Sequence, residues 1–367
     1  MNLGEPQLQE AIAKRKAIWT DFADIRYLRF SDQCRDVLRG TVVVDDRVIH
    51  GYPRIGRILA LGRGLSEQFS APFWAEEKVD GYNVRICRIG GRTIAITRGG
   101  YICPFTTDRI VDFIDSSVFD KDPDLVICAE VAGPDNPYVE SCPQFIDSDI
   151  ELFVFDLMYL DRSGFIPHAD KYRCIESYEL PAVRCLGRFT TADLGKIRET
   201  LRRFNEEGRE GLVFKEDTPE RRCTKYVTSN SSIADIRSTA ENILELPPEY
   251  FTSRILRLAL FLREQGLEHS AGLDRQLGAA FLDGLLAAIA QYEQDGKAHH
   301  RFRCRFRQRD SALALLAHLS DVARHKARIT RRDLRQDGEH WVLEYDRTYP
   351  SLNTLLGNLL KGGQMYD

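Results

Sequence analysis

The stretch Phe73-Trp74-Ala75-Glu76-Glu77-Lys78-Val79-Asp80-Gly81-Tyr82-Asn83-Val84-Arg85-Ile86 decides the interpretation of this sequence. Segments rich in aromatic and β-branched residues flank Lys-Val-Asp-Gly, which predicts two strands with a lysine where they meet. The tetrapeptide alone is a weak signal. It gains weight from the blocks that follow in order: Thr97-Arg98-Gly99-Gly100, Ala129-Glu130-Val131-Ala132-Gly133, Phe153-Val154-Phe155-Asp156, Glu210-Gly211-Leu212-Val213-Phe214-Lys215 and Lys225-Tyr226.

Lysine is scarce in this chain, with 11 lysines against 40 arginines. A guanidinium stays protonated and cannot serve as a nucleophile, so a chain that prefers arginine keeps lysine where an amine is needed. Three of the six lysines between Ala71 and Glu245 lie in the blocks above, namely Lys78, Lys215 and Lys225. These three lysines are therefore candidates for chemistry.

The middle of the chain predicts an antiparallel α+β fold. Strands are expected at 75–79, 83–89, 93–97, 125–130, 150–159 and 211–215, and only two strong helices, at 107–115 and 191–205, interrupt them. There is no regular β-α-β alternation and no glycine-rich phosphate loop, so a Rossmann or P-loop fold is disfavoured.

The flanking regions differ from this core. Residues 1–20 are expected to form a helix, followed by a hairpin that turns at Asp45-Asp46. After Pro247-Pro248 the periodicity becomes helical, over 250–265, 273–294 and 311–325. We therefore expect an N-terminal α+β unit (1–70), a central antiparallel domain (71–245), a helical domain (246–309) and a C-terminal α/β domain (310–367). The amphipathic helices of the third domain form either a core or a subunit interface.

Composition places the chain among ordinary globular proteins, with 43% hydrophobic and 29% charged residues and a net charge of −4. No apolar run approaches the length of a membrane span, and nine scattered cysteines favour a reducing cytoplasm. Between Lys297 and Arg335 the chain is strongly basic. There the alternation in Arg-Phe-Arg-Cys-Arg-Phe-Arg puts Arg301, Arg303, Arg305 and Arg307 on one strand face. That face is either a contact for the phosphates of a polyanion or a charged edge strand at an interface.

Over residues 73–227 the ordered blocks resemble the covalent nucleotidyltransferase superfamily of polynucleotide ligases and mRNA capping enzymes. Asn83, five residues after the lysine, is typical of RNA ligases. The strings at 51–58, 78–86 and 225–228, and the later order of helix, arginine-rich strand and helix, are similar to archaeal-type homodimeric ATP-dependent RNA ligases. The resemblance implies an antiparallel-sheet, ATP-grasp-like ligase core with a small N-terminal α+β unit and a mainly helical C-terminal region. It also implies that 71–245 is the catalytic domain and 246–309 a dimerisation domain.

The resemblance also implies roles for individual residues. Lys78 would be the nucleophile that forms a lysyl-AMP, which requires its pKa to be depressed by cations or by burial. Glu210 would hold Mg²⁺ or Mn²⁺. The remaining expectations are Glu76 at the adenine edge, Asp80 shaping the loop, Asn83 in the nucleotide pocket, Arg98 and Glu130 at the ribose, Phe155 stacked on the purine, and Lys215 and Lys225 at the α-phosphate. One departure from many ligases is that Lys225 stands alone, without a second lysine two positions away; Arg222 is the candidate for that second cation.

The expected function is joining of 5′-phosphate and 3′-hydroxyl ends of single-stranded RNA, with ATP and a divalent cation, by a cytoplasmic homodimer. The alternatives are a non-catalytic RNA-binding protein of the same fold, and a DNA ligase or capping guanylyltransferase. The natural RNA, the acceptance of DNA and the choice between intramolecular and intermolecular joining stay open.

Overall fold

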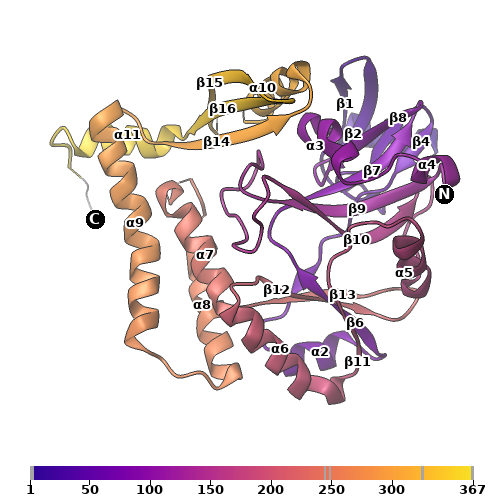
Figure 1. The fold of residues 1–367 in the computed structure, drawn as a ribbon, viewed down its shortest axis with the longest axis horizontal. Helices are drawn as coiled ribbons and strands as arrows, with labels where there is room; N and C mark the ends of the chain where they lie inside the picture. The colour runs from indigo at the N-terminus through magenta and orange to yellow at the C-terminus, as the bar shows by residue number, and fades with distance from the viewer. Residues whose placement is uncertain (1–3, 244, 248, 324–325, 365–367) are drawn as a thin grey trace.

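The computed structural model describes residues 4–364 except 244, 248, 324 and 325, and its strands form four sheets (Figure 1). The N-terminal sheet has the order β1-β2-β3-β4. Its strands are β1 (Ala17–Phe22), β2 (Ile25–Phe30), β3 (Val42–Val44) and β4 (Arg47–Ile49), preceded by α1 (Glu5–Ala13). Asp45 and Asp46 both have positive φ at the β3–β4 turn, as the expected hairpin requires.

The expected helix over 1–20 is wrong beyond residue 13, and residues 1–3 lie outside the described part. Arg15 adopts a left-handed conformation with φ of 55°, which ends the helical path. Ala17 to Phe22 then pair with β2, and Trp19 is exposed on this strand. Pairing with a neighbouring strand has overridden the helical spacing of the apolar residues.

Two further sheets form the body of the expected catalytic domain, which we call the catalytic body. One has the order β10-β9-β7-β8 and the other the order β11-β6-β12-β13-β5. Neighbouring strands are antiparallel, except that β5 pairs parallel to β13. Their strands are β5 (Gly56–Arg57), β6 (Phe73–Lys78), β7 (Tyr82–Ile89), β8 (Arg92–Thr97), β9 (Leu125–Ala132), β10 (Glu151–Tyr159), β11 (Cys185–Phe189), β12 (Gly211–Glu216) and β13 (Cys223–Val227).

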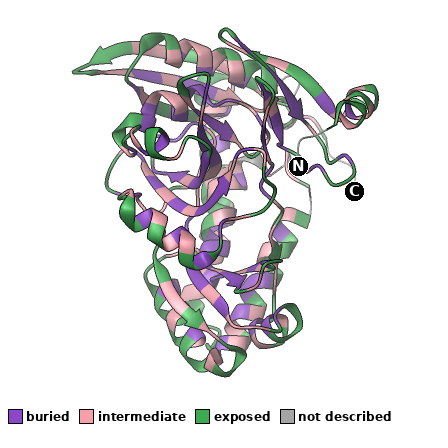
Figure 2. Cartoon of the chain, turned by 90° about the vertical axis from the view of Figure 1, so that its right-hand side faces the viewer, coloured by how far each residue is buried: buried purple, intermediate pink, exposed green. Residues whose placement is uncertain are grey.

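More helices accompany this body than the two expected. The expected helices correspond to α3 (Pro104–Arg109) with η1 (Ile110–Asp112), and to η2 (Thr191–Asp193) with α6 (Leu194–Glu206). Buried residues are concentrated in the strands between the helices (Figure 2). The helices that the sequence did not indicate are α2 (Leu61–Gln68), α4 (Val118–Lys121), α5 (His168–Ser177) and α7 (Ser229–Thr239) with η3 (Ala240–Asn242).

The C-terminal region is mainly helical, as expected. It contains α8 (Glu249–Gln265), α9 (Ala271–Asp295), α10 (Arg309–Ala323) and α11 (Pro350–Leu359). The last residue expected in the third helix, His325, lies outside the described part. The three-stranded sheet β14-β16-β15 completes the region, with β14 (His299–Phe306), β15 (Arg328–Asp337) and β16 (His340–Thr348). Because β14 precedes residue 310 and pairs with β16, this sheet spans the expected boundary at 309/310, and the domain division stays a prediction.

The C-terminal sheet shares a hydrophobic core with the catalytic body. Phe302, Cys304 and Phe306 on β14 belong to the same buried cluster as Val84 and Ile127 of the catalytic sheet. The helix α10 contributes Leu315 and Leu319 to this cluster. The sheet and α10 are therefore fixed against the catalytic body, beside the candidate site.

Candidate active site

Strand register brings the motif residues of β6, β12 and β13 onto one sheet face. Glu76 of β6 pairs with Val213 of β12, which pairs with Lys225 of β13. Two residues along, Lys78 pairs with Gly211. Residues paired across strands point to the same side of a sheet, so Glu76, Lys78 and Lys225 share a face.

Two motif glycines allow the backbones around Lys78 to approach one another. A Cβ on Gly81 would lie 2.3 Å from the carbonyl oxygen of Val131, and one on Gly211 would lie 2.2 Å from that of Tyr226. Gly211 also has φ of 150°, a conformation that residues with side chains rarely adopt. Because Gly211 pairs with Lys78, Glu210 just before it is brought against the lysine.

The second sheet supplies the facing wall. Asn83 of β7 pairs with Glu130 of β9, and the buried Asn83 Oδ1 has no hydrogen-bond partner among the described residues. The β9–β10 register shifts between Val154 and Asp156, which marks a bulge at Phe155. The Phe155 ring packs edge-on against Tyr52, with 5.2 Å between ring centroids.

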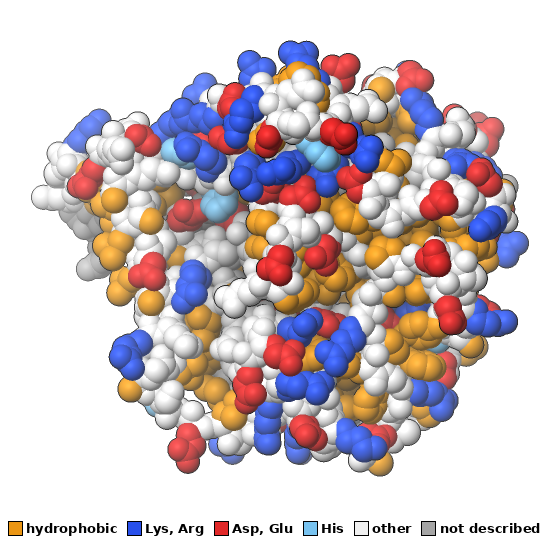
Figure 3. All heavy atoms as spheres, in the orientation of Figure 1, with side chains coloured by type: hydrophobic (Ala, Val, Ile, Leu, Met, Phe, Trp, Pro, Cys, Tyr) orange, Lys and Arg blue, Asp and Glu red, His pale blue; other side chains and the backbone are white. Residues whose placement is uncertain are grey.

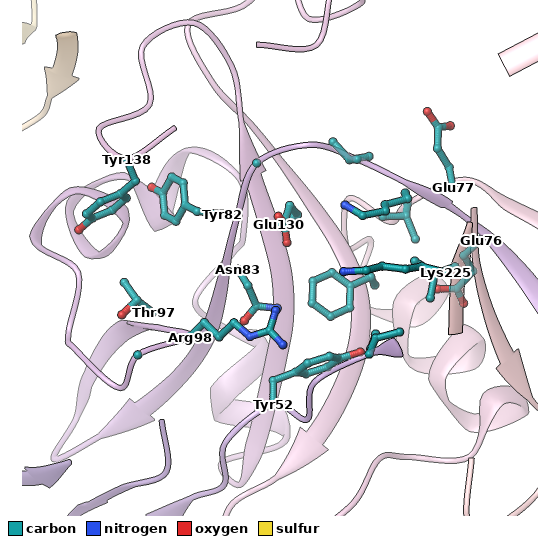
Figure 4. A pocket seen from close by; sticks show the side chains of 18 of the residues that line it. Tyr52, Glu76, Glu77, Tyr82, Asn83, Thr97, Arg98, Glu130, Tyr138 and Lys225 are labelled. Carbon is teal, nitrogen blue, oxygen red and sulfur yellow. The ribbon is translucent and has the colours of Figure 1, made fainter. Parts of the chain in front are cut away.

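A cavity of about 500 Å³ lies between the two sheets. In Figure 4, Glu76 and Lys225 lie at one end, Tyr82 and Tyr138 at the other, and Asn83, Arg98 and Glu130 between them. The structure thus brings eight sequence-predicted residues to one cavity: Glu76, Lys78, Asn83, Arg98, Glu130, Phe155, Lys215 and Lys225. The C-terminal region contributes to the wall through His318 and Val322 of α10.

Lys78 also lines a second cavity, of about 320 Å³, together with Asp80 and Glu210. The Lys78 Nζ lies 2.6 Å from Glu210 Oε2, and Ser141 Oγ donates a 2.6 Å hydrogen bond to Asp80 Oδ2. The lysine therefore stands where a cavity lined by aromatic and basic groups meets one lined by carboxylates.

The surroundings of Lys78 are more acidic than a cluster of lysines alone would make them. Burial lowers the pKa of Lys78, but Glu210, Glu130 and Asp80 outweigh this effect and leave the pKa raised. The expected depression depends on a divalent metal as well as on neighbouring lysines and stays a prediction, because carboxylates from three separate segments surround this amine in the protein alone. Cations placed on those carboxylates would reverse the balance.

The carboxylates near Lys78 are short of positive charge. Burial raises the pKa of Glu130 to about 8 and the pKa of Glu210 to about 7, although Lys78 lowers both. One ammonium group does not compensate for the buried acidic groups around it. Carboxylate oxygens are the ligands that Mg²⁺ and Mn²⁺ prefer, so Glu210 and its neighbour Asp80 fit a divalent cation.

Lys215 lies in a buried ion cluster at the Glu76 end of the cavity. Its Nζ donates to the Phe155 carbonyl at 2.6 Å and to Asp156 Oδ2 at 3.1 Å, and lies 2.8 Å from Glu76 Oε2. Lys171 of α5 pairs with the other oxygen of Glu76. Acceptors surround the Lys215 amine, so its contribution at the α-phosphate stays a prediction, while its contacts orient Glu76 and Phe155.

Lys225 presents a cation to the cavity. Among the described residues no carboxylate lies within ion-pair distance of its Nζ, and burial, Lys78 and Arg57 lower the pKa of Lys225 to about 8. Arg222, the expected second cation of this motif, instead bonds Glu216 at 2.8 Å. Arg57 pairs with Lys225 from β5 and is the better candidate.

Arg301, Arg303 and Arg305 of β14 face outward, as their alternation predicts, while Arg307 lies just beyond the end of the strand at Phe306. Lys and Arg side chains gather over this part of the surface, interspersed with acidic ones (Figure 3). Arg301 is paired with Asp346 at 3.1 Å, Arg303 and Arg305 with Asp135 at 3.1 and 3.5 Å, and Arg307 with Asp112 at 2.6 Å. RNA phosphates would have to compete with these carboxylates, and the RNA role of this face stays a prediction.

Sequence reasoning missed several residues of the site. Tyr52 and Arg57 lie in the block 51–58, which was noted only for its resemblance. Lys171 was missed because α5 buries His168, Lys171 and Ile175, a face too polar to produce an amphipathic pattern. The one sequence signal for Lys171 is that it is among the three lysines between residues 71 and 245 that lie outside the motif blocks, in a chain where lysine is scarce.

Comparison with known proteins agrees with this geometry. Residues 71–227 match the family model described as RNA ligase, and residues 238–363 match the one described as the Ligase Pab1020 C-terminal region. The chain shows 49% identity to a structure named putative ATP-dependent DNA ligase from Aquifex aeolicus, covering 99% of this chain and 100% of that one, with a TM-score of 0.95.

A structure named archaeal ATP-dependent RNA ligase, form 1, shows 30% identity over 98% of this chain and 96% of that one, with a TM-score of 0.88. Among curated proteins, the uncharacterized protein MJ0414 of Methanocaldococcus jannaschii is 28% identical, covering 79% of this chain and 75% of that protein. The fold is that of the covalent nucleotidyltransferase superfamily. The chain belongs to the family of archaeal-type ATP-dependent RNA ligases. In the described part of the chain, no helix is both long enough and apolar enough for a membrane span.

Proposed function

We propose that this protein joins RNA ends in three steps that use ATP. Lys78 Nζ attacks the α-phosphorus of ATP, a P–N bond forms and pyrophosphate leaves. The AMP is then transferred to an oxygen of the RNA 5′-phosphate, giving A(5′)pp(5′)RNA and freeing the amine. Finally a 3′-oxygen attacks the phosphorus of the RNA 5′-phosphate, a phosphodiester forms and AMP leaves.

The position of Lys78 at the junction of two cavities is the observation that carries this proposal. The larger cavity offers each contact that adenosine needs: an aromatic ring at Phe155, an acceptor at Glu76 and hydroxyl partners at Glu130 and Arg98. The unpaired ammonium of Lys225 can balance charge on the α-phosphate. The second cavity extends from Lys78 past Asp80 and Glu210, whose carboxylates would need a bound cation before phosphate groups could lie there.

Glu210 and Asp80 would hold the divalent cation, which when bound supplies positive charge that opposes the raised pKa of Lys78 and stabilises the phosphates. Glu210 has a direct part in this balance. While it pairs with Lys78 at 2.6 Å it keeps the amine protonated, and leaving that pair lets Lys78 lose its proton before attack.

RNA is the proposed substrate because residues 71–227 match the RNA ligase model and Asn83 replaces the arginine typical of DNA ligases. The name of the Aquifex aeolicus structure makes DNA the second candidate. Incubation with ATP, Mg²⁺ and 5′-labelled oligomers separates them: the proposal predicts adenylylated and joined RNA, with DNA much slower. Joining of DNA alone would contradict it.

We further propose that the protein is a homodimer assembled through α8 and α9, in the cytoplasm, where its nine free cysteines would remain reduced. Leu256, Leu282 and Leu286 are 52%, 58% and 61% exposed, so their apolar surface would be shielded from water only in a complex. Sedimentation should give a dimer for the wild type and a monomer for Leu282→Asp/Leu286→Asp. A wild-type monomer would contradict this assembly.

A further inference from the structure

The helix α5 places a buried lysine outside the family motifs at the wall of the nucleotide cavity. The Lys171 side chain is 1% exposed, and its Nζ bonds Glu76 Oε1 and lies 3.3 Å from the Phe155 carbonyl. Both contacts are to residues that line the cavity. The proposed reaction leaves Lys171 without a part.

The two oxygens of Glu76 are in different situations. Oε1 accepts from Lys171 and, at 2.5 Å, from the Tyr172 hydroxyl. Oε2 forms a 2.8 Å ion pair with Lys215 Nζ and has no other partner among the described residues. Glu76 lines the cavity, and Oε2 is its less occupied acceptor, held by one ammonium group where Oε1 is held by an ammonium and a hydroxyl.

The surrounding cations keep Glu76 ionised. Burial alone would raise the pKa of Glu76, but Lys215 and Lys171 hold it well below its ordinary value. An ionised carboxylate only accepts hydrogen bonds, so a ligand group beside Oε2 must donate. Adenine carries an amino group at C6, whereas guanine carries a carbonyl, which would face the carboxylate acceptor to acceptor.

We infer that Lys171 is a positioning residue for base selection, which holds Glu76 oriented as a pure acceptor so that the site takes a 6-aminopurine and rejects a 6-oxopurine. This inference rests on the proposed function, in which the base of ATP lies beside Glu76. Lys171 acts through Glu76 and touches neither the base nor the phosphates.

Lys171 serves this purpose more specifically than Lys215. Lys215 divides its amine among the Phe155 carbonyl, Asp156 and Glu76, and Arg221 bonds Asp156 from the other side at 2.6 Å. The cluster holds three cations, Lys171, Lys215 and Arg221, against the two carboxylates of Glu76 and Asp156. Removing Lys171 leaves two of each, so the buried charges stay balanced and the variant is expected to fold.

The contrasting view is that Lys171 is only a buried counter-ion. A counter-ion would change stability and would lower the rate for every nucleotide by the same factor. A base-selecting residue changes the ratio between nucleotides, and that ratio is the quantity to measure.

The test compares labelling of Lys78 by ATP, by GTP and by purine riboside triphosphate, which has no group at C6, in wild type and Lys171→Met. A hydrogen bond to a charged acceptor predicts a wild-type preference in kcat/KM of about ten- to a hundredfold for ATP over the purine analogue. Lys171→Met should reduce this preference at least about tenfold, through KM, and relax discrimination against GTP. Lys171→Arg should restore part of the preference, and Lys196→Met, a surface lysine paired with Asp193, should leave it unchanged.

An unchanged preference in folded Lys171→Met, with all three rates lowered equally, would overturn the inference. If that variant does not fold, Tyr172→Phe removes one donor to Oε1 and no charge; it should lower the preference severalfold, and an unchanged preference would again overturn the inference. A wild type that takes no label from ATP overturns the proposed function and this inference together. A labelled wild type with an insensitive ratio overturns the inference alone.

Discussion

Replacing Phe155 by alanine should weaken the use of ATP without unfolding the protein. The bulge in β10 turns this half-buried ring to the cavity wall, edge-on to Tyr52 at 5.2 Å. Stacking of a base on an aromatic ring is worth about 1 to 3 kcal/mol, so the KM for ATP in labelling of Lys78 should rise about ten- to a hundredfold. The lost pair with Tyr52 costs about 0.5 to 1.5 kcal/mol beyond the buried area, which a folded domain tolerates.

The neighbouring Phe153 provides the matched control. It lies on the same strand and packs against Phe145 with 6.4 Å between ring centroids, but it does not line the cavity. Phe153→Ala should therefore lower the melting temperature while leaving the KM for ATP unchanged. An unchanged KM in Phe155→Ala, or an equal rise in both variants, would refute the stacking assignment.

Three further predictions concern other parts of the account. Lys78→Ala should still seal RNA supplied as A(5′)pp(5′)RNA, because the last step uses the pocket without the amine; complete failure with an active wild type would leave the three-step scheme unsupported. Changing Arg301, Arg303, Arg305 and Arg307 to glutamine should reduce the slope of log K for RNA binding against log salt concentration by up to about three, at about 0.7 per phosphate, and should leave labelling of Lys78 unaffected. An unchanged slope would exclude phosphate contacts, and a changed oligomeric state would assign the face to an interface. In the metal-free protein the pKa of Glu130 is raised from 4.5 to about 8, so folding takes up a proton between these pH values and the free energy of unfolding falls as the pH rises through this window. Thermal melts at pH 6 and 8.5 should therefore show a smaller loss of stability for Glu130→Gln than for the wild type. An identical pH dependence would show that Glu130 ionises normally.

Sequence patterns predicted what depends on strong local signals. The helices α8, α9 and α10 follow clear apolar periodicity, and Lys78, Lys215 and Lys225 stand in ordered motifs. The antiparallel core follows from short β-rich segments without intervening crossover helices. The helix at the N-terminus was wrong because pairing of Ala17–Phe22 with β2 is a tertiary effect that spacing does not record.

Long-range pairing explains why some residues of the site were not predicted from the sequence. Arg57 reaches Lys225 through a parallel bridge between strands 168 residues apart, and Lys171 reaches Glu76 across 95 residues. The raised pKa of Lys78 likewise depends on carboxylates from separate strands and loops. Sequence order can list the charged residues of a site, but it does not show which of them are neighbours.

The most direct test of the central claim is the covalent labelling of Lys78. The protein is incubated with Mg²⁺ and α-labelled ATP or GTP and then separated under denaturing conditions, with Lys78→Arg as the variant that keeps the charge and loses the nucleophile. The account predicts label from ATP and much less from GTP, on a peptide containing Lys78, and none on folded Lys78→Arg. Strong labelling of Lys78→Arg, or a wild type labelled by neither nucleotide, would contradict it.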